Sequence, residues 1–168
     1  RIEKQYDDNE EMIIASLMPI LMKQKIKLID SLQKGIKNPA QIQNVDIAFK
    51  GEYENKIVDM AKKIFDDGVA DVKEEMRIRI TTPAEAKSWV ISNAKNIAEK
   101  HLADLKFAVI SAALVGISKE LSEKEILFKA SESFDNFTDI KLVDSAALIN
   151  QNFYANGREW TALEGGTK

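Results

Sequence analysis

The sequence predicts an all-α protein: an elongated helical domain with antiparallel packing around one long central helix at about residues 83–115. Three observations support this fold class. Apolar residues recur at three- and four-residue steps over most of the chain, alternating patterns typical of strands are minor, and the longest periodic stretch has helix signals at both ends. A helix of that length measures roughly 50 Å at about 1.5 Å per residue, so other helices should pack along it.

Residues 7–34 predict the first helix, because its acidic start and lysine-rich end suit the helix dipole. Pro19 removes a backbone donor inside it, which predicts a kink or two shorter helices meeting near Met18. Apolar side chains surround almost its whole circumference, so one face is expected to bind another subunit, although core packing explains the same residues. The candidate partner-binding residues on this helix are Ile13, Ile14, Met18, Leu21 and Met22.

A connection follows Gly35, and Pro39 in it can open a short helical turn. Helical spacing returns over residues 46–76, which predicts the second long helix. Gly51 and Gly68 each cost about 1 kcal/mol inside a helix relative to alanine, so a break near either is expected. Residues 77–80 alternate charge and isoleucine and predict a short extended link.

The central helix has the clearest end signals. Thr82 is its expected N-cap, Pro83 its first residue, and Glu85 completes a capping box. Gly116 is the expected stop, and apolar residues repeat between these ends. The predicted buried stripe consists of Ile91, Ala94, Ala98, Leu102, Leu105, Val109 and Ala112.

Beyond Gly116, Ser122 and Glu125 form a second capping box that opens the next helix. Turn-forming residues at 135–138 predict a break, and residues 139–156 predict a last helix that stops at Gly157. Residues 159–168 have no period and are expected to be a frayed tail of the single domain 1–168.

The composition excludes several classes of function. The chain has no cysteine and one histidine, which removes thiolate metal sites and most catalytic triads, so we expect no catalytic residue, no bound metal and no cofactor. The net charge of -3 without a basic stripe argues against sequence-specific nucleic-acid binding. No charge-free apolar run is long enough for a membrane span, so we expect no membrane association. The chain starts at Arg1, which predicts that it is a fragment of a longer protein.

Three clusters have both a chemical and a structural interpretation. Asp66, Asp67 and Asp71 resemble the aspartate-rich motif of magnesium-dependent all-α isoprenoid synthases, but a solvated acidic face is the simpler interpretation. His101 needs a carboxylate to act as a base, whereas a hydrogen-bonded histidine between helices needs none. Arg158 follows Asn156 and Gly157 and is a candidate anion- or partner-binding residue, or a surface arginine after a helix cap.

Residues 83–126 followed by 145–160 resemble the helical region of the head-morphogenesis family, the Mu-like minor head proteins of tailed bacteriophages. In that family a proline-started helix with an early tryptophan leads to a glycine stop, a serine and acidic segment, and a helix closing on Asn, Gly and Arg. The matching positions are Pro83, Trp89, Gly116, Ser118, Glu120, Asn156, Gly157 and Arg158. Asn150 and Gln151 depart from the threonine and glutamate frequent there, and the family's cysteine-containing segment is absent.

The resemblance implies a non-enzymatic structural protein carried inside the phage head near the portal. Its expected partners are the portal or other head proteins, with self-association as a further possibility, and its expected locations are the virion and, during assembly, the host cytoplasm. Two alternatives stay open at this point. One is a bacterial helical protein-interaction module that binds a small protein through the first helix, and the other is a magnesium-dependent all-α diphosphate enzyme.

Overall fold

The computed structural model describes residues 2–166, and this part of the chain is helical without a strand. Its elements are α1 (Ile2–Gly35), α2 (Pro39–Gln43), α3 (Lys50–Met76), α4 (Ala84–Ser118) and α5 (Glu123–Gly166). The all-α prediction is therefore confirmed. The turn expected at Pro39 is α2, where the Asn38 side chain accepts a hydrogen bond from the Ala40 N–H.

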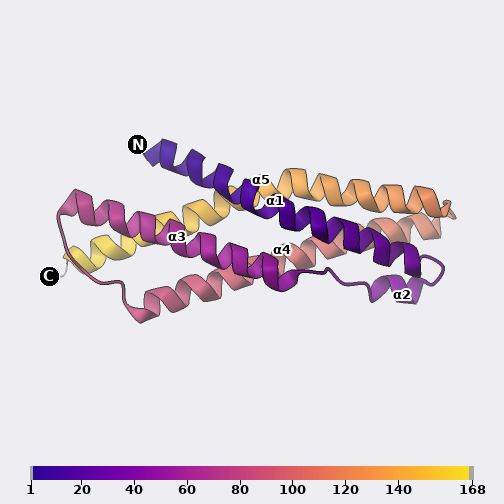
Figure 1. The fold of residues 1–168 in the computed structure, drawn as a ribbon, viewed down its shortest axis with the longest axis horizontal. Helices are drawn as coiled ribbons and strands as arrows, with labels where there is room; N and C mark the ends of the chain where they lie inside the picture. The colour runs from indigo at the N-terminus through magenta and orange to yellow at the C-terminus, as the bar shows by residue number, and fades with distance from the viewer. Residues whose placement is uncertain (1, 167–168) are drawn as a thin grey trace.

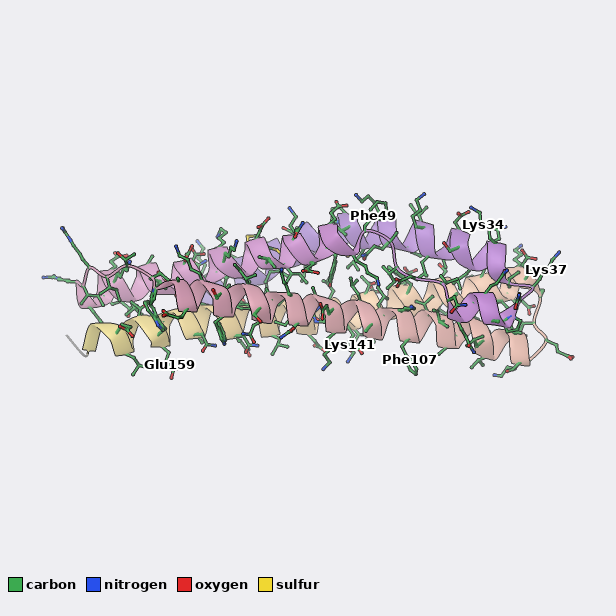
Figure 2. All side chains as sticks on the ribbon, turned by 90° about the horizontal axis from the view of Figure 1, so that it is seen from below. Lys34, Lys37, Phe49, Phe107, Lys141 and Glu159 are labelled. Carbon is green, nitrogen blue, oxygen red and sulfur yellow. The ribbon has the colours of Figure 1, made fainter. Side chains whose placement is uncertain are left out.

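The four long helices form an elongated antiparallel bundle (Figure 1). One layer contains α1 and α3, and the other contains α4 and α5 (Figure 2). The predicted central helix is α4, but α3 and α5 share the central position, because each of them contacts the three other long helices. The core extends along the bundle, and five of the seven residues predicted for the α4 stripe are buried, whereas Ile91 and Ala112 are half-buried.

Two glycines that were expected to interrupt helices lie inside them, where α3 and α5 cross. A Cβ on Gly68 would clash with the carbonyl oxygen of Tyr154, and a Cβ on Gly157 would clash with that of Phe65. Both glycines therefore permit close backbone contact. The predicted break near Gly68 and the predicted stop at Gly157 are wrong.

The boundaries of α5 correct three further expectations. The helix is continuous from Glu123 to Gly166, so no break occurs at 135–138 and residues 159–166 are not a frayed tail. Burial explains the continuity, since Phe134, Thr138 and Thr161 all face the core. Residues 167–168 lie outside the described part of the chain. At the start of α5, Ser122 Oγ accepts a hydrogen bond from the Glu125 N–H at 3.2 Å, as the capping box predicts.

The ends of the other helices depart from prediction by smaller amounts. Helix α1 is one continuous helix with Pro19 inside it. Pro83 has an extended ψ of 157°, so α4 begins after it and Thr82 lies too far outside to cap the helix. At the other end, α4 passes Gly116 and ends at Ser118.

One buried polar pair joins α1 to α5. Asn9 Nδ2 donates to Asn150 Oδ1 at 3.0 Å, and both side chains are almost completely buried. Gln5 donates to Asn9 Oδ1 at 2.9 Å. Further along, Lys25 Nζ lies 2.7 Å from Asp135 Oδ1. These contacts define the antiparallel register of α1 and α5.

Candidate functional site

The residues predicted to bind a partner fall into three groups. Ile13 and Leu21 are buried in the core, so their assignment to a binding surface is wrong: they occupy the α1 face that packs inward. Ile14 and Met18 are half-buried at the edge of this core, and only Met22 is well exposed. The apolar circumference of α1 arises because one side covers the bundle interior while the next is left uncovered.

The uncovered side of α1 continues onto α5. The register fixed by Asn9–Asn150 and Lys25–Asp135 places Ile140 and Val143 in the same stretch of the bundle as Met18 and Met22. We call these residues, together with Ile26, the α1–α5 patch: Met18, Met22, Ile26, Ile140 and Val143. The sequence contained a signal for Ile140, because it lies two positions after buried Thr138 and so points to the opposite face of a helix.

Arg158, the remaining predicted partner-binding residue, is held by its own chain. Its Nη1 and Nη2 atoms donate to the two carboxylate oxygens of Glu75 at 3.0 and 2.9 Å, and its guanidinium lies 5.9 Å from the Tyr154 ring centre. Gly157 is inside α5, so no freed backbone N–H groups stand beside this arginine. The anion-site interpretation is therefore wrong, and the arginine joins α5 to α3.

The three aspartates of the diphosphate-enzyme alternative do not converge. Asp67 pairs with Lys63 at 3.1 Å on its own helix, Asp66 is exposed, and Asp71 accepts a hydrogen bond from the Tyr154 hydroxyl. Burial and the hydrogen bond to Asp71 raise the pKa of Tyr154 to about 12. Among the described residues no cluster of three or more acidic or histidine side chains is arranged to hold a metal ion.

His101 joins three helices through a buried polar network. Its Nδ1 lies 3.3 Å from the Tyr53 hydroxyl on α3, and its Nε2 lies 2.8 Å from Ser145 Oγ on α5. Burial lowers the pKa of His101, which favours the neutral imidazole. The two hydroxyls occupy both ring nitrogens, so no carboxylate orients the ring as a catalytic base requires. The structural interpretation of this histidine fits the geometry.

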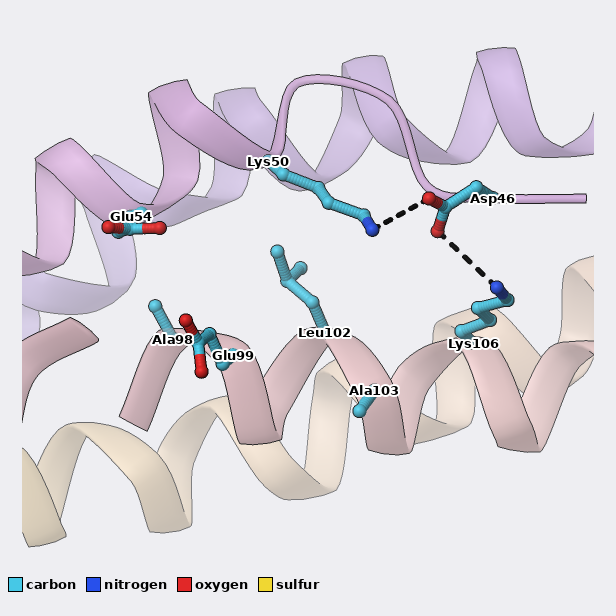
Figure 3. A pocket seen from close by; sticks show the side chains of 8 residues that line it. All are labelled: Asp46, Lys50, Glu54, Ala98, Glu99, Leu102, Ala103 and Lys106. Carbon is cyan, nitrogen blue, oxygen red and sulfur yellow. Dashed lines mark ion pairs between the residues drawn. The ribbon is translucent and has the colours of Figure 1, made fainter. Parts of the chain in front are cut away.

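A hollow of about 450 Å³ lies where the link between α2 and α3 passes over α4 (Figure 3). Asp46 in this link contacts Lys50 at 2.7 Å and Lys106 at 3.5 Å. The hydrogen bond from Lys50 lowers the pKa of Asp46. On the other side of the link, the Ala48 carbonyl accepts a hydrogen bond from Gln24 of α1 at 3.0 Å. These charges therefore fasten the link to the bundle.

A second surface feature is the α4–α5 groove, defined by three hollows that follow one another along the two helices. Their volumes are about 380, 190 and 400 Å³, and they lie beside Trp89, Asp104 and Val115, respectively. Helix α4 also has the length and composition to cross a membrane, with a mean hydropathy of 1.5 over an 18-residue window. A core helix passes the same test, so this property alone does not establish a span.

No family model, curated protein or solved structure matches this chain.

Proposed function

We propose that this chain is a structural protein that works by binding other protein subunits, and that it is a minor head protein of a tailed phage or prophage. In this proposal it associates with the portal inside the head and contributes to assembly or DNA delivery. The observation that carries the binding role is the α1–α5 patch, in which Met22, Ile26, Ile140 and Val143 are exposed on two helices that pack against each other. Exposed apolar surface is typical of interaction sites when such side chains gather on neighbouring elements.

The composition of the patch suits a protein partner. Met18 and Met22 have flexible, polarizable side chains that adapt to an irregular surface. Lys25 and Asp135 pair with each other beside them, so neither of these two charges requires a partner from the bound protein. The helices beneath are fixed by the Asn9–Asn150 pair, which keeps the patch preorganised.

The polar clusters favour a structural role over catalysis. The aspartates at 66, 67 and 71 have separate surroundings, and His101 is held between two hydroxyls. Asp71 and His101 form contacts between helices, Asp67 pairs within α3, and neither arrangement combines a nucleophile with an oriented base.

The phage assignment rests on the resemblance of the sequence. Several of the matching residues belong to one packed end of the bundle: Trp89 lies 6.5 Å from the Phe65 ring and 5.8 Å from the Phe153 ring, and Gly157 is at the α3–α5 crossing. Residues that carry the family resemblance therefore also pack helices together in this chain. This supports the proposal that the chain shares a helical unit with that family.

Gel filtration of the purified chain with the portal protein encoded in the same genome tests the proposal. We expect the two proteins to migrate together, and we expect Met22→Lys combined with Ile26→Lys to abolish the complex, because two buried ammonium groups would lack partners. Leu163→Lys is the matched control, since Leu163 is 64% exposed and Ile26 is 67% exposed. Absence of a complex with the unchanged chain contradicts the portal assignment. Unimpaired binding by the double variant contradicts the role of the patch.

A further inference from the structure

The α4–α5 groove is a long surface that the chain itself leaves uncovered, on a different side from the α1–α5 patch. Its three hollows extend from Trp89 to Leu121, over most of α4. Phe107 and Lys141 project from the same long side of the molecule, away from α1 and α3 (Figure 2). Phe107 is 76% exposed, the largest exposed fraction among the large apolar side chains described.

The C-terminal half of α4 is more apolar than a solvated face requires. Residues 101–118 contain only two charged side chains, Asp104 and Lys106. Most of these residues are buried or half-buried within the chain, but the large apolar side chains of Phe107 and Val115 are exposed. A surface of this composition is expected to be covered by a partner.

Four charged residues mark the middle of the groove. Lys100 and Asp104 are one helical turn apart on α4, and Lys141 and Asp144 are about one turn apart on α5. All four side chains are exposed, and within residues 2–166 none of them forms an ion pair. In this middle part of the groove, each helix therefore presents one positive and one negative charge to whatever covers it.

This order of side chains is self-complementary when the helix is reversed. Consider two copies of α4 that pack antiparallel, with the centre of the contact midway between Lys100 and Asp104. Lys100 of each copy then faces Asp104 of the other copy. The same reversal pairs Ile97 with Phe107, Asn93 with Ser111, and Trp89 with Val115. In these three pairs, apolar residues meet apolar ones and polar residues meet polar ones.

Helix α5 has the same property about its own midpoint. Reversal between Lys141 and Asp144 pairs these two charges and also places Phe137 opposite Leu148. The two midpoints lie side by side, because His101 Nε2 on α4 is 2.8 Å from Ser145 Oγ on α5. A single twofold axis, perpendicular to the helices and in the plane of the interface, therefore satisfies both helices together.

We propose that the α4–α5 groove binds a second copy of this chain, with α4 antiparallel to α4 and α5 antiparallel to α5 of the second copy. Charge complementarity identifies the occupant, because the two charges at the middle of each helix match their own reversal about one shared axis. The apolar pairs supply most of the association energy, and the four charge pairs, two on the α4–α4 contact and two on the α5–α5 contact, fix the register.

Sedimentation equilibrium over a range of protein concentrations tests the dimer. We expect the unchanged chain to dimerise at about 100 µM or below, and the variant Lys100→Asp with Lys141→Asp to dissociate at least about tenfold more readily, because acidic side chains then face acidic ones. Adding Asp104→Lys and Asp144→Lys to that variant exchanges the charges and should restore the dimer. A purely local effect on the fold would not be reversed in this way. Phe128→Ser is the control, since Phe128 is 67% exposed and outside the groove.

The absence of cysteine allows a direct test of register. A mixture of chains with Ile97→Cys and chains with Phe107→Cys should form a disulfide-linked dimer on mild oxidation, whereas Ile97→Cys mixed with Phe128→Cys should not. A chain that stays monomeric at all concentrations, a groove that takes up only another protein, or cross-linking without preference between these mixtures overturns the proposal. Loss of portal binding does not affect it, because the two surfaces are separate.

Discussion

At the scale of single residues, two glycines determine how closely α3 and α5 approach. Gly68 and Gly157 each face the backbone of the opposite helix, at a separation that excludes a methyl group. In an interior packed this densely, one added carbon atom forces the backbone to shift, and the shift destabilises the folded chain. The absence of a side chain at these two positions therefore allows the backbones of α3 and α5 to lie in close contact.

Gly157→Ala should lower the free energy of unfolding by about 1–3 kcal/mol or more, because the new methyl group forces the two helices apart. Urea denaturation followed by circular dichroism measures the change. Gly51→Ala is the control: nothing lies within 4 Å of its Cβ position, and it should raise stability by about 0.5–1 kcal/mol through helix propensity. Equal effects at both positions would contradict close contact at the crossing.

His101 provides a prediction for the dependence of stability on pH. Burial lowers its pKa in the folded chain below the ordinary value of 6.5, so the unfolded chain binds the proton first as the pH falls. The contribution of neutral His101 to the free energy of unfolding is fully present above pH 6.5. It is lost as the pH falls from 6.5 through the lowered pKa that His101 has in the folded chain. His101→Gln should therefore flatten the decline of unfolding free energy over that range, measured by urea denaturation at a series of pH values. A variant that declines as steeply as the unchanged chain would count against this assignment.

At the scale of the helices, α3 and α4 are each followed, within two residues of their ends, by a residue that is unusual for its backbone conformation. Arg77 has a φ of 54° and Glu120 has a φ of 57°, in the left-handed region where glycine is favoured. At the end of α4, the Leu121 N–H donates to the Gly116 carbonyl at 3.1 Å and the Glu120 N–H donates to the Ile117 carbonyl at 3.0 Å. This hydrogen-bond pattern requires the left-handed residue.

Glu120→Gly should raise the free energy of unfolding by about 1 kcal/mol, because glycine has no Cβ to strain in this conformation. Arg77→Gly should give a similar gain, and the two should add, since they cap different helices. Thermal or urea unfolding measures both. Lys119→Gly is the matched control: its φ is -88°, so it should not stabilise the chain, and a gain there equal to that at Glu120 would refute the argument from strain.

The helices also show what a sequence pattern can and cannot predict. The spacing of apolar residues correctly predicted the α4 stripe, and the Ser122 capping box predicted the start of α5, because both depend on residues close together in the chain. Gly68 and Gly157 were interpreted by their local propensity, which favours a helix end. Their contacts are between helices far apart in the sequence, so tertiary packing overrides that propensity.

The same limit applies to the candidate binding residues. The apolar character of α1 was visible, but only the position of α5 separates buried Ile13 and Leu21 from exposed Met22. Ile140 and Val143 complete the patch from the other end of the chain, and no pattern within α1 alone could indicate them.

At the scale of the whole molecule, the two uncovered surfaces give the bundle different possible neighbours. The α1–α5 patch is proposed to receive a different protein, and the α4–α5 groove a second copy. Since they are on separate sides, a dimer formed through the groove would still present two patches, one from each copy. A symmetric particle of this kind would bind a multimeric partner with avidity set by the distance between its patches.

The asparagine pair between α1 and α5 has a consequence for the origin of the patch. A shift of α1 by one helical turn along α5 would keep most apolar contacts. It would leave the side-chain amides of Asn9 and Asn150 buried without hydrogen-bond partners, which costs more free energy than a poorly packed methyl group. The hydrogen bond between these two residues, which are 141 positions apart in the sequence, therefore selects one alignment among several that apolar packing alone would allow. The position of the proposed binding patch is thus determined by a contact in the interior of the bundle.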